Sequence, residues 1–194
     1  MILRYKYPLT AAFAVMALSA CASMKAVPAG VPFKAETAFT VTPSTSWTRI
    51  PDNLNPTVGS ALTQDGVPLG AVYLVTVKNE KPMLDKFKRK NLPRYTSGST
   101  ALEQIDFLKS SMNLLGYVDV LPTNVAPKSV DGHSATQFGF TGKYPNGLEM
   151  QGDAIIFEAN DQLNIVFYAA PKMHYYHKYK NDADTLFNSV RLKK

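Results

Sequence analysis

Apolar residues recur at intervals of three and four in one stretch of the chain, where they are Ile105, Leu108, Met112 and Leu115. This spacing places them on one face of a helix. Thr100 and Glu103 lie just before the stretch at the spacing of a capping box, in which each side chain binds a free backbone N–H of the first turn. Gly116 follows in the position that favours a left-handed C-cap. The pattern predicts a helix over residues 100–116 whose apolar face is ordinary core.

Strands are predicted where β-branched and aromatic residues alternate with polar ones, or form short apolar runs between turn residues. Before the helix, these patterns predict strands at residues 37–42 and 67–77, with the single Trp47 in a short turn or strand between them. After the helix they predict an antiparallel meander, with strands at residues 117–127, 134–144, 148–159 and 162–171. The turn residues Pro145-Asn146-Gly147 separate the second and third of these strands.

The C-terminal segment, residues 171–192, has a helical pattern with a candidate break near Asn181-Asp182. Its inward-facing residues are expected to be Ala183, Leu186, Phe187 and Val190. A meander of strands flanked by helices is typical of α+β proteins. We therefore expect a single α+β domain in which an antiparallel β-sheet packs against helices.

Residues 1–20 have the layout of a bacterial export signal. Arg4 and Lys6 precede an apolar run of about 12 residues, LTAAFAVMALSA, which ends in small side chains. A helix that spans a bilayer permanently needs about 20 apolar residues, so this run is too short to be a transmembrane anchor.

The next residues resemble the lipobox of bacterial lipoproteins, because Leu18-Ser19-Ala20-Cys21 joins an aliphatic residue, two small residues and a cysteine. The resemblance implies cleavage between Ala20 and Cys21, a diacylglyceryl group on the Cys21 thiol, and a further fatty acid such as palmitate on the new α-amine. Each buried methylene contributes about 0.8 kcal/mol, so two or three acyl chains hold a protein at a membrane essentially permanently. Cys21 is the only cysteine, so it has no partner for a disulfide.

Localisation and domain organisation follow from this resemblance. Ala22 comes directly after Cys21, and a residue other than aspartate there implies the outer membrane, with the domain facing the periplasm. Residues 1–20 are then a signal peptide, and residues 21–36 are an acylated cysteine with a flexible tether, which contains Pro28, Gly30 and Pro32. Fully extended, this tether would reach on the order of 50 Å. Residues 37–194 are expected to form the globular domain.

The positive charge of the chain is local. The chain has 21 Lys and Arg against 15 Asp and Glu. Arg4 and Lys6 belong to the signal, so 19 basic and 15 acidic side chains, or +4, remain after it. Five basic residues gather in a predicted loop: Lys86, Lys88, Arg89, Lys90 and Arg94. This loop is either simply solvated or a contact with anionic lipid, periplasmic glycan or an acidic envelope protein. Nucleic acid is not expected as a partner of an exported, lipid-anchored protein.

Two of the histidines are candidate metal ligands. His174 and His177 are three residues apart and would share a helix face, and a third ligand could come from Asp182, Asp184 or His133. Three neighbouring lysines disfavour a bound cation: Lys172, Lys178 and Lys180. The aromatic residues between them instead predict an amphipathic contact surface, made of His174, Tyr175, Tyr176, His177 and Tyr179. We predict no metal site and no cofactor.

No catalytic constellation is predicted either. The chain has no G-x-S-x-G elbow, no dinucleotide fingerprint and no phosphate-binding glycine loop. His133 and Ser134 are neighbours in sequence, which does not bring their side chains together. The carboxylate pairs Glu149/Asp153 and Asp182/Asp184 are interpreted as solvated turns and strand edges.

The order of the C-terminal segments resembles the PsbP-like fold of plant oxygen-evolving-complex subunits and bacterial periplasmic proteins. The segments that carry the resemblance are GHSATQFGFTGKY, AIIFEANDQLNIVFYAAP and the final helix ending in FNSVRL. The chain is also similar to a group of alphaproteobacterial lipoproteins in which a DG-led strand, here Asp65-Gly66, precedes a KRKPLPR-like loop, here residues 88–94. The likeness covers roughly residues 37–192 and implies a fold rather than an activity.

Three functional hypotheses remain. The first is a non-enzymatic envelope lipoprotein that acts through its surface as an accessory or assembly factor. The second is a periplasmic domain that binds a small or lipidic ligand in an apolar cavity between sheet and helix. The third is an unrecognised hydrolase, which needs a histidine within hydrogen-bond reach of a nucleophile.

Overall fold

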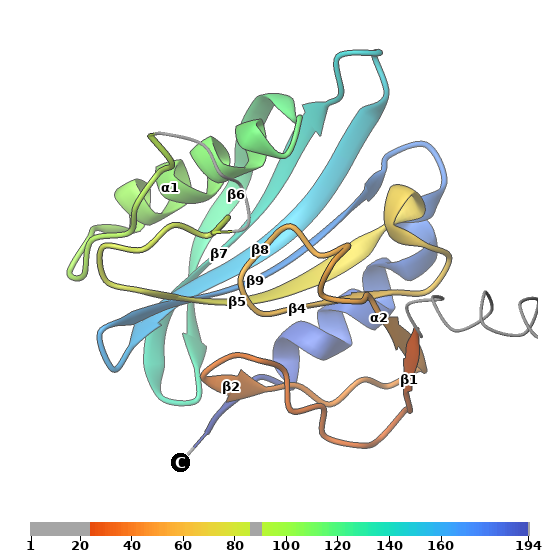
Figure 1. Ribbon diagram of the computed structural model, residues 1–194, viewed down its shortest axis with the longest axis horizontal. Helices are drawn as coiled ribbons and strands as arrows, with labels where there is room; N and C mark the ends of the chain where they lie inside the picture. Colours follow the sequence, from red (N-terminus) through yellow and green to blue (C-terminus); the bar gives the residue numbers. More distant parts are fainter. Residues whose placement is uncertain (1–23, 86–90, 194) are drawn as a thin grey trace, which may run out of the picture.

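The computed structural model describes residues 24–85 and 91–193 (Figure 1). Its main element is an eight-stranded antiparallel sheet with the strand order β1-β3-β4-β5-β9-β8-β7-β6. In that order the strands are Lys25–Val27, Trp47–Arg49, Ser60–Thr63, Ala71–Lys78, Gln162–Pro171, Glu149–Ala159, His133–Lys143 and Val118–Val130. A small second sheet pairs β2 (Phe39–Thr40) with β10 (Arg191–Leu192). The helices are α1 (Ala101–Leu114), α2 (Tyr175–Asn188) and the short 3-10 helix η2 (Val67–Leu69).

The two long helices lie on opposite faces of the large sheet (Figure 1). Helix α1 packs with Ile105 and Leu108 against a core layer that includes Phe167. Helix α2 packs with Leu186 against the other layer, which includes Tyr168. Successive residues of a strand point to opposite faces, so the central strand β9 is buried on both sides. The expected α+β domain, an antiparallel sheet packed against helices, is confirmed.

Helix α1 begins as predicted. The Thr100 hydroxyl accepts a hydrogen bond from the Glu103 backbone N–H at 3.4 Å, and the Glu103 carboxylate accepts one from the Thr100 N–H at 2.7 Å. The bond from the Thr100 backbone lowers the pKa of the Glu103 carboxyl. Gly116, just past the helix, has a φ of +97°, which is the left-handed conformation that glycine favours.

The predicted meander is also confirmed, because its four strands appear in the expected order as β6 to β9. The C-terminal helix is shorter than the expected 171–192, because Pro171 ends β9 and Arg191–Leu192 form β10, and it also differs in its continuity. Asn181 and Asp182 lie inside the continuous helix α2, so the helix is unbroken there. The reason is packing: Ala183 and Leu186 are buried against the sheet and carry the helix through the polar residues.

The expected boundaries before the helix need correction. Residues 25–27 form β1, which pairs with β3, so this part of the expected tether belongs to the sheet. Of the strand expected at 37–42, only Phe39–Thr40 forms a strand. The strand expected at 67–77 begins at Ala71, because Pro68 and its neighbours form η2 instead. Among the described residues, no helix combines the length and the apolar character that crossing a bilayer requires.

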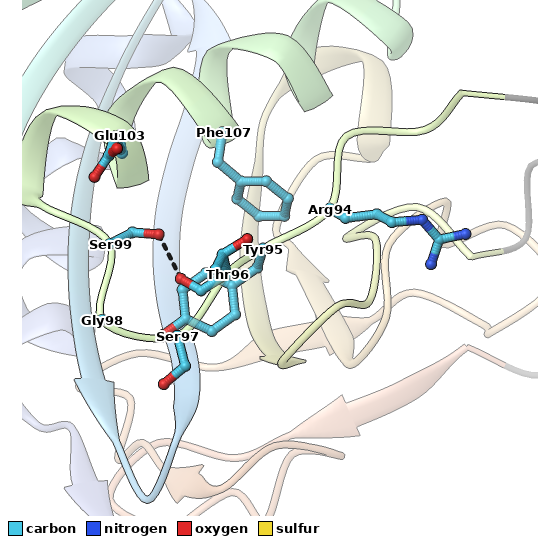
Figure 2. Close-up of a pocket in the computed structure, with 8 residues that line it drawn as sticks. All are labelled: Arg94, Tyr95, Thr96, Ser97, Gly98, Ser99, Glu103 and Phe107. Carbon is cyan, nitrogen blue, oxygen red and sulfur yellow. Dashed lines mark hydrogen bonds between the residues drawn. The ribbon is translucent and has the colours of Figure 1, made fainter.

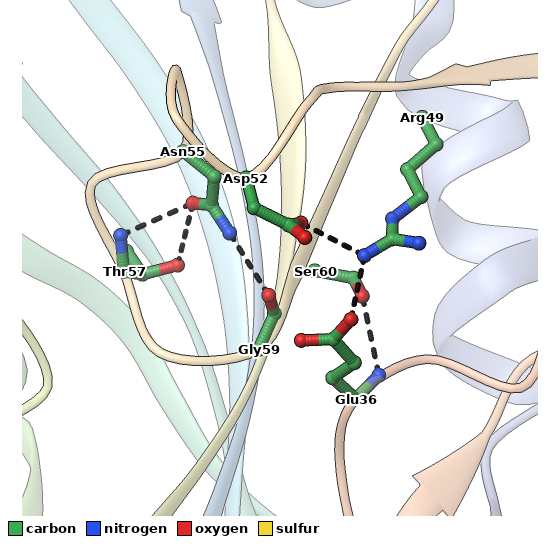
Figure 3. A network of polar contacts seen from close by, with 7 residues as sticks. All are labelled: Glu36, Arg49, Asp52, Asn55, Thr57, Gly59 and Ser60. Carbon is green, nitrogen blue, oxygen red and sulfur yellow. Dashed lines mark hydrogen bonds and ion pairs between the residues drawn. The ribbon is translucent and has the colours of Figure 1, made fainter. Parts of the chain in front are cut away.

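A polar network fixes the segments beside β1 (Figure 3). One terminal nitrogen of Arg49, on β3, lies 2.8 Å from a carboxylate oxygen of Glu36 and 2.8 Å from one of Asp52. The buried Asn55 accepts hydrogen bonds from the backbone and hydroxyl of Thr57. The ion pairs are partly exposed and contribute at most about 1 kcal/mol each. Their importance is positional, since they hold the 51–57 loop and the chain before β2 against the same strand.

Candidate functional surfaces

The candidate contact surface on α2 begins with exposed residues. Met173 is 97% exposed just before the helix, and His174 and His177 are exposed as well. Each imidazole packs edge-on against a tyrosine ring, His174 against Tyr175 and His177 against Tyr176. His174 and His177 are thus exposed beside tyrosine rings, and their role as contacts stays a prediction.

The structure contradicts the prediction for one residue of that surface. Tyr176 is buried, and its ring stacks on Tyr168 with centroids 5.9 Å apart. Burial raises the pKa of its hydroxyl, which donates a 2.8 Å hydrogen bond to Asp153. Tyr176 therefore belongs to the core, because it lies on the side of α2 that faces the sheet.

Lys178 and Tyr179 are tied to the turn before β5. Both donate 2.6 Å bonds to the Asp65 carboxylate, and the Lys178 ammonium lies 4.7 Å from the centre of the Tyr179 ring. The hydrogen bond from Lys178 is the main cause that lowers the pKa of the Asp65 carboxyl. These contacts orient the start of α2 on the domain.

The other predicted contact residues lie elsewhere. Lys86, Lys88, Arg89 and Lys90 fall outside the described residues. Arg94 is exposed and donates a 2.7 Å hydrogen bond to the Glu80 carbonyl. Arg94 lies beside α1, on the face of the sheet opposite to α2. Arg94 and the exposed residues at the start of α2 thus belong to two separate surfaces.

A pocket of about 400 Å³ lies between residues 94–99 and the first turns of α1 (Figure 2). Its lining is mostly polar, with Phe107 as an apolar wall. Two of the hydroxyls around it have partners: Ser97 donates a 2.8 Å bond to Glu158, and Ser99 donates to the Thr96 carbonyl. The pocket is an open depression rather than the apolar cavity that a lipidic ligand needs.

Glu158, on β8, holds the loop that forms this pocket. Its carboxylate accepts hydrogen bonds from the Ser97 hydroxyl and from the Gly98 backbone N–H, the latter at 3.1 Å. Burial acts to raise the pKa of this carboxyl, but the hydrogen bonds outweigh burial and the pKa is lower than usual. Glu158 is an ionised anchor for the loop. No histidine is among the residues that line the pocket, and the Ser97 hydroxyl is bonded to a carboxylate rather than to an imidazole.

The structure does not bring the candidate metal ligands together. His133 begins β7, in the hairpin whose Asp131 accepts a 2.9 Å bond from the Leu192 N–H, near the C-terminal end of α2. His174 is at the other end of the helix, about 20 Å away along its axis. Asp182 lies two turns into the helix and accepts a bond from Gln64. Within residues 24–85 and 91–193, no group of three or more potential ligands is placed to hold a metal ion.

A half-buried charged cluster between β8 and α2 was missed from the sequence. Lys180 lies 3.6 Å from a carboxylate oxygen of Asp153 and 2.6 Å from one of Asp184. Burial raises the pKa of the Asp153 carboxyl, and the hydrogen bond from Tyr176 only partly offsets this. The i, i+4 spacing of Lys180 and Asp184 was a usable signal for half of the cluster. The pairing with Asp153 depends on the tertiary fold. Asp153 and Glu149 were both expected to be solvated. Asp153 joins this cluster instead, and Glu149 pairs with Lys172.

The fold has known relatives. Neither models of protein families nor curated protein sequences match the chain. Among solved structures, the cyanobacterial PsbP protein CyanoP of Synechocystis is 13% identical, with a TM-score of 0.54 over 90% of this chain and 95% of its own. LpqN of Mycobacterium tuberculosis, a protein involved in cell envelope biogenesis, is 11% identical, with a TM-score of 0.50 over 88% and 92%. At these identities the likeness shows the fold alone, and it confirms the expected PsbP-like fold.

Proposed function

We propose that this chain is a non-enzymatic cell-envelope lipoprotein, held at the outer membrane by acyl chains on Cys21 and facing the periplasm. The observation that carries the proposal is the sequence Leu18-Ser19-Ala20-Cys21 after a basic and then apolar segment. That order supplies what lipoprotein processing needs: an apolar segment for export, small side chains around the scissile bond and a thiol for the lipid.

The domain would act through its surface as an accessory or assembly factor. Both faces of the sheet are packed, since the side chains of β9 and of both helices fill the two core layers. The polar groups that the fold brings together have structural roles: Glu158 orders a loop and Asp153 joins a charged cluster. A role in the envelope is supported by the shared fold of LpqN, whose part in cell envelope biogenesis is a precedent for it. The 86–94 loop and the exposed residues of 173–179 are the proposed contacts with an envelope protein or an anionic surface.

Two measurements test this. The first is the mass of the N-terminal peptide from membranes of cells that express the full chain, where we expect Cys21 to be the first residue and to carry two or three acyl chains. An unmodified Cys21, or cleavage elsewhere, would refute the anchor. The second is cross-linking in intact cells, with Cys21→Ser on a non-lipoprotein signal as the matched control. We expect one envelope partner that only the anchored form captures. Capture of no specific partner by either form would refute the accessory role.

A further inference from the structure

The sheet begins very close to the proposed lipid. The first residue of β1 is Lys25, only four positions after Cys21. Four residues reach at most about 14 Å, even when fully extended. The expected tether of residues 21–36 would have allowed on the order of 50 Å. An anchor on Cys21 therefore keeps β1, the edge strand of the sheet, next to the bilayer.

The surface around β1 has the composition of a membrane contact. Met24 is 54% exposed, and Val31, which follows β1, is 51% exposed. Leu54, at 54%, lies in the turn after Pro51, and Pro51 and Lys25 line one small pocket. Lys25, next to Met24 in sequence, and Lys34, three residues after Val31, are also exposed. Apolar side chains flanked by lysines suit the boundary between acyl chains and anionic head groups.

This surface is held as one unit. Arg49 pairs in register with Lys25, and its guanidinium contacts both Glu36 and Asp52 (Figure 3). The Leu54 N–H donates a 2.9 Å hydrogen bond to the Pro51 carbonyl. The segments that carry Met24, Val31 and Leu54 are thus joined to β3 through β1, Glu36 and Asp52.

We propose that the β1 edge lies against the membrane, with Met24, Val31 and Leu54 in the head-group region and Lys25 and Lys34 near lipid phosphates. The other edge of the sheet is then directed into the periplasm. Seven strand spacings separate β1 from β6, or about 33 Å along the sheet. The exposed Leu121 and Val125 on β6 lie at that distal edge and are open to partners that are not in the membrane. This orientation rests on the proposed anchor at Cys21.

The test uses the acylated full chain in vesicles of phosphatidylethanolamine and phosphatidylglycerol that contain a head-group nitroxide lipid. Cys21 is the only cysteine and its thiol is blocked by lipid, so an introduced cysteine gives a single labelling site. A bimane probe is placed at Leu54→Cys or Val31→Cys, with Leu121→Cys on β6 as the matched control. We expect quenching several-fold stronger at residues 31 and 54 than at residue 121.

The outcomes are distinguishable. Equal quenching at all three positions, or the strongest quenching at residue 121, would overturn the orientation while leaving the anchor intact. A chain that does not float with the vesicles would refute the anchor itself, and the orientation with it. Lys25→Glu combined with Lys34→Glu should weaken quenching at residue 54 without changing flotation, because each lysine shifts the docked state about fivefold. Unchanged quenching in this variant would overturn the role of the lysines.

Discussion

Val27 offers a direct test of whether the chain just after Cys21 is sheet or tether. Its side chain is buried in the core layer under α2, and its backbone lies opposite Trp47 in the β1–β3 ladder. Val27→Ala removes about two methylene equivalents at roughly 0.8 kcal/mol each and leaves a small cavity, so it should cost about 2 kcal/mol. For a domain of this size, that corresponds to a loss of about 4–8 °C in Tm.

The single tryptophan makes the assay simple. Trp47 is the only tryptophan and it is buried beside Val27, so its fluorescence reports unfolding at this site. Urea titrations would compare Val27→Ala with the parent domain, both carrying Cys21→Ser to avoid the lipid. Lys25→Ala is the matched control, since its side chain is exposed and it should change the free energy of unfolding by less than about 0.5 kcal/mol. If Val27→Ala is as silent as the control, residues 25–27 are not part of the sheet and the short reach from Cys21 is wrong.

Three further changes probe other parts of the fold. Burial raises the pKa of the Asp153 carboxyl, so protonation of this carboxyl stabilises the folded state. This stabilisation is complete below the ordinary pKa of 3.8 and is lost as the pH rises through the folded-state pKa. Asp153→Asn stays neutral, so urea titrations from pH 3 to 8 should show it gaining stability over the parent as the pH rises; a constant difference would refute this. Thr100→Ala removes the N-cap of α1 and should cost about 1 kcal/mol in the same titration, whereas no loss would contradict the capping box. At Gly59, where φ is +102°, a Cβ would lie 2.3 Å from the Leu74 carbonyl oxygen, so Gly59→Ala should cost at least about 2 kcal/mol; an unchanged melting curve, followed by circular dichroism, would refute that geometry.

Local patterns were sufficient for the elements whose stability signals lie within one segment. Helix α1 carries its own capping box, at Thr100 and Glu103, and its own apolar stripe. The strands β6 to β9 are long and are joined by short turns, so the sequence shows both their alternation and their order. The α+β class and the PsbP-like fold followed from these elements.

Only the tertiary structure decided the short strands and the faces of the sheet. Strands β1 and β3 have three residues each, and their pairing joins segments about twenty residues apart, which no local pattern reveals. The expected tether was therefore wrong at β1, which belongs to the sheet. The placement of the predicted contact residues relative to the sheet also depended on the tertiary structure. Nothing near Arg94 in sequence tells that it lies across the sheet from α2, whereas Tyr176 is seven residues before Ala183 and this helical spacing was a usable signal that it faces the core.

The sequence by itself carries the proposed attachment, because the resemblance to a lipobox lies in a short linear pattern that ends at Cys21. How close the attachment point lies to the sheet depended on the fold. Burial of Val27 and the pairing of Lys25 with Arg49 place the edge of the sheet four residues from Cys21, the proposed attachment point. That position results from contacts between distant segments, and such contacts form only when the whole sheet is assembled.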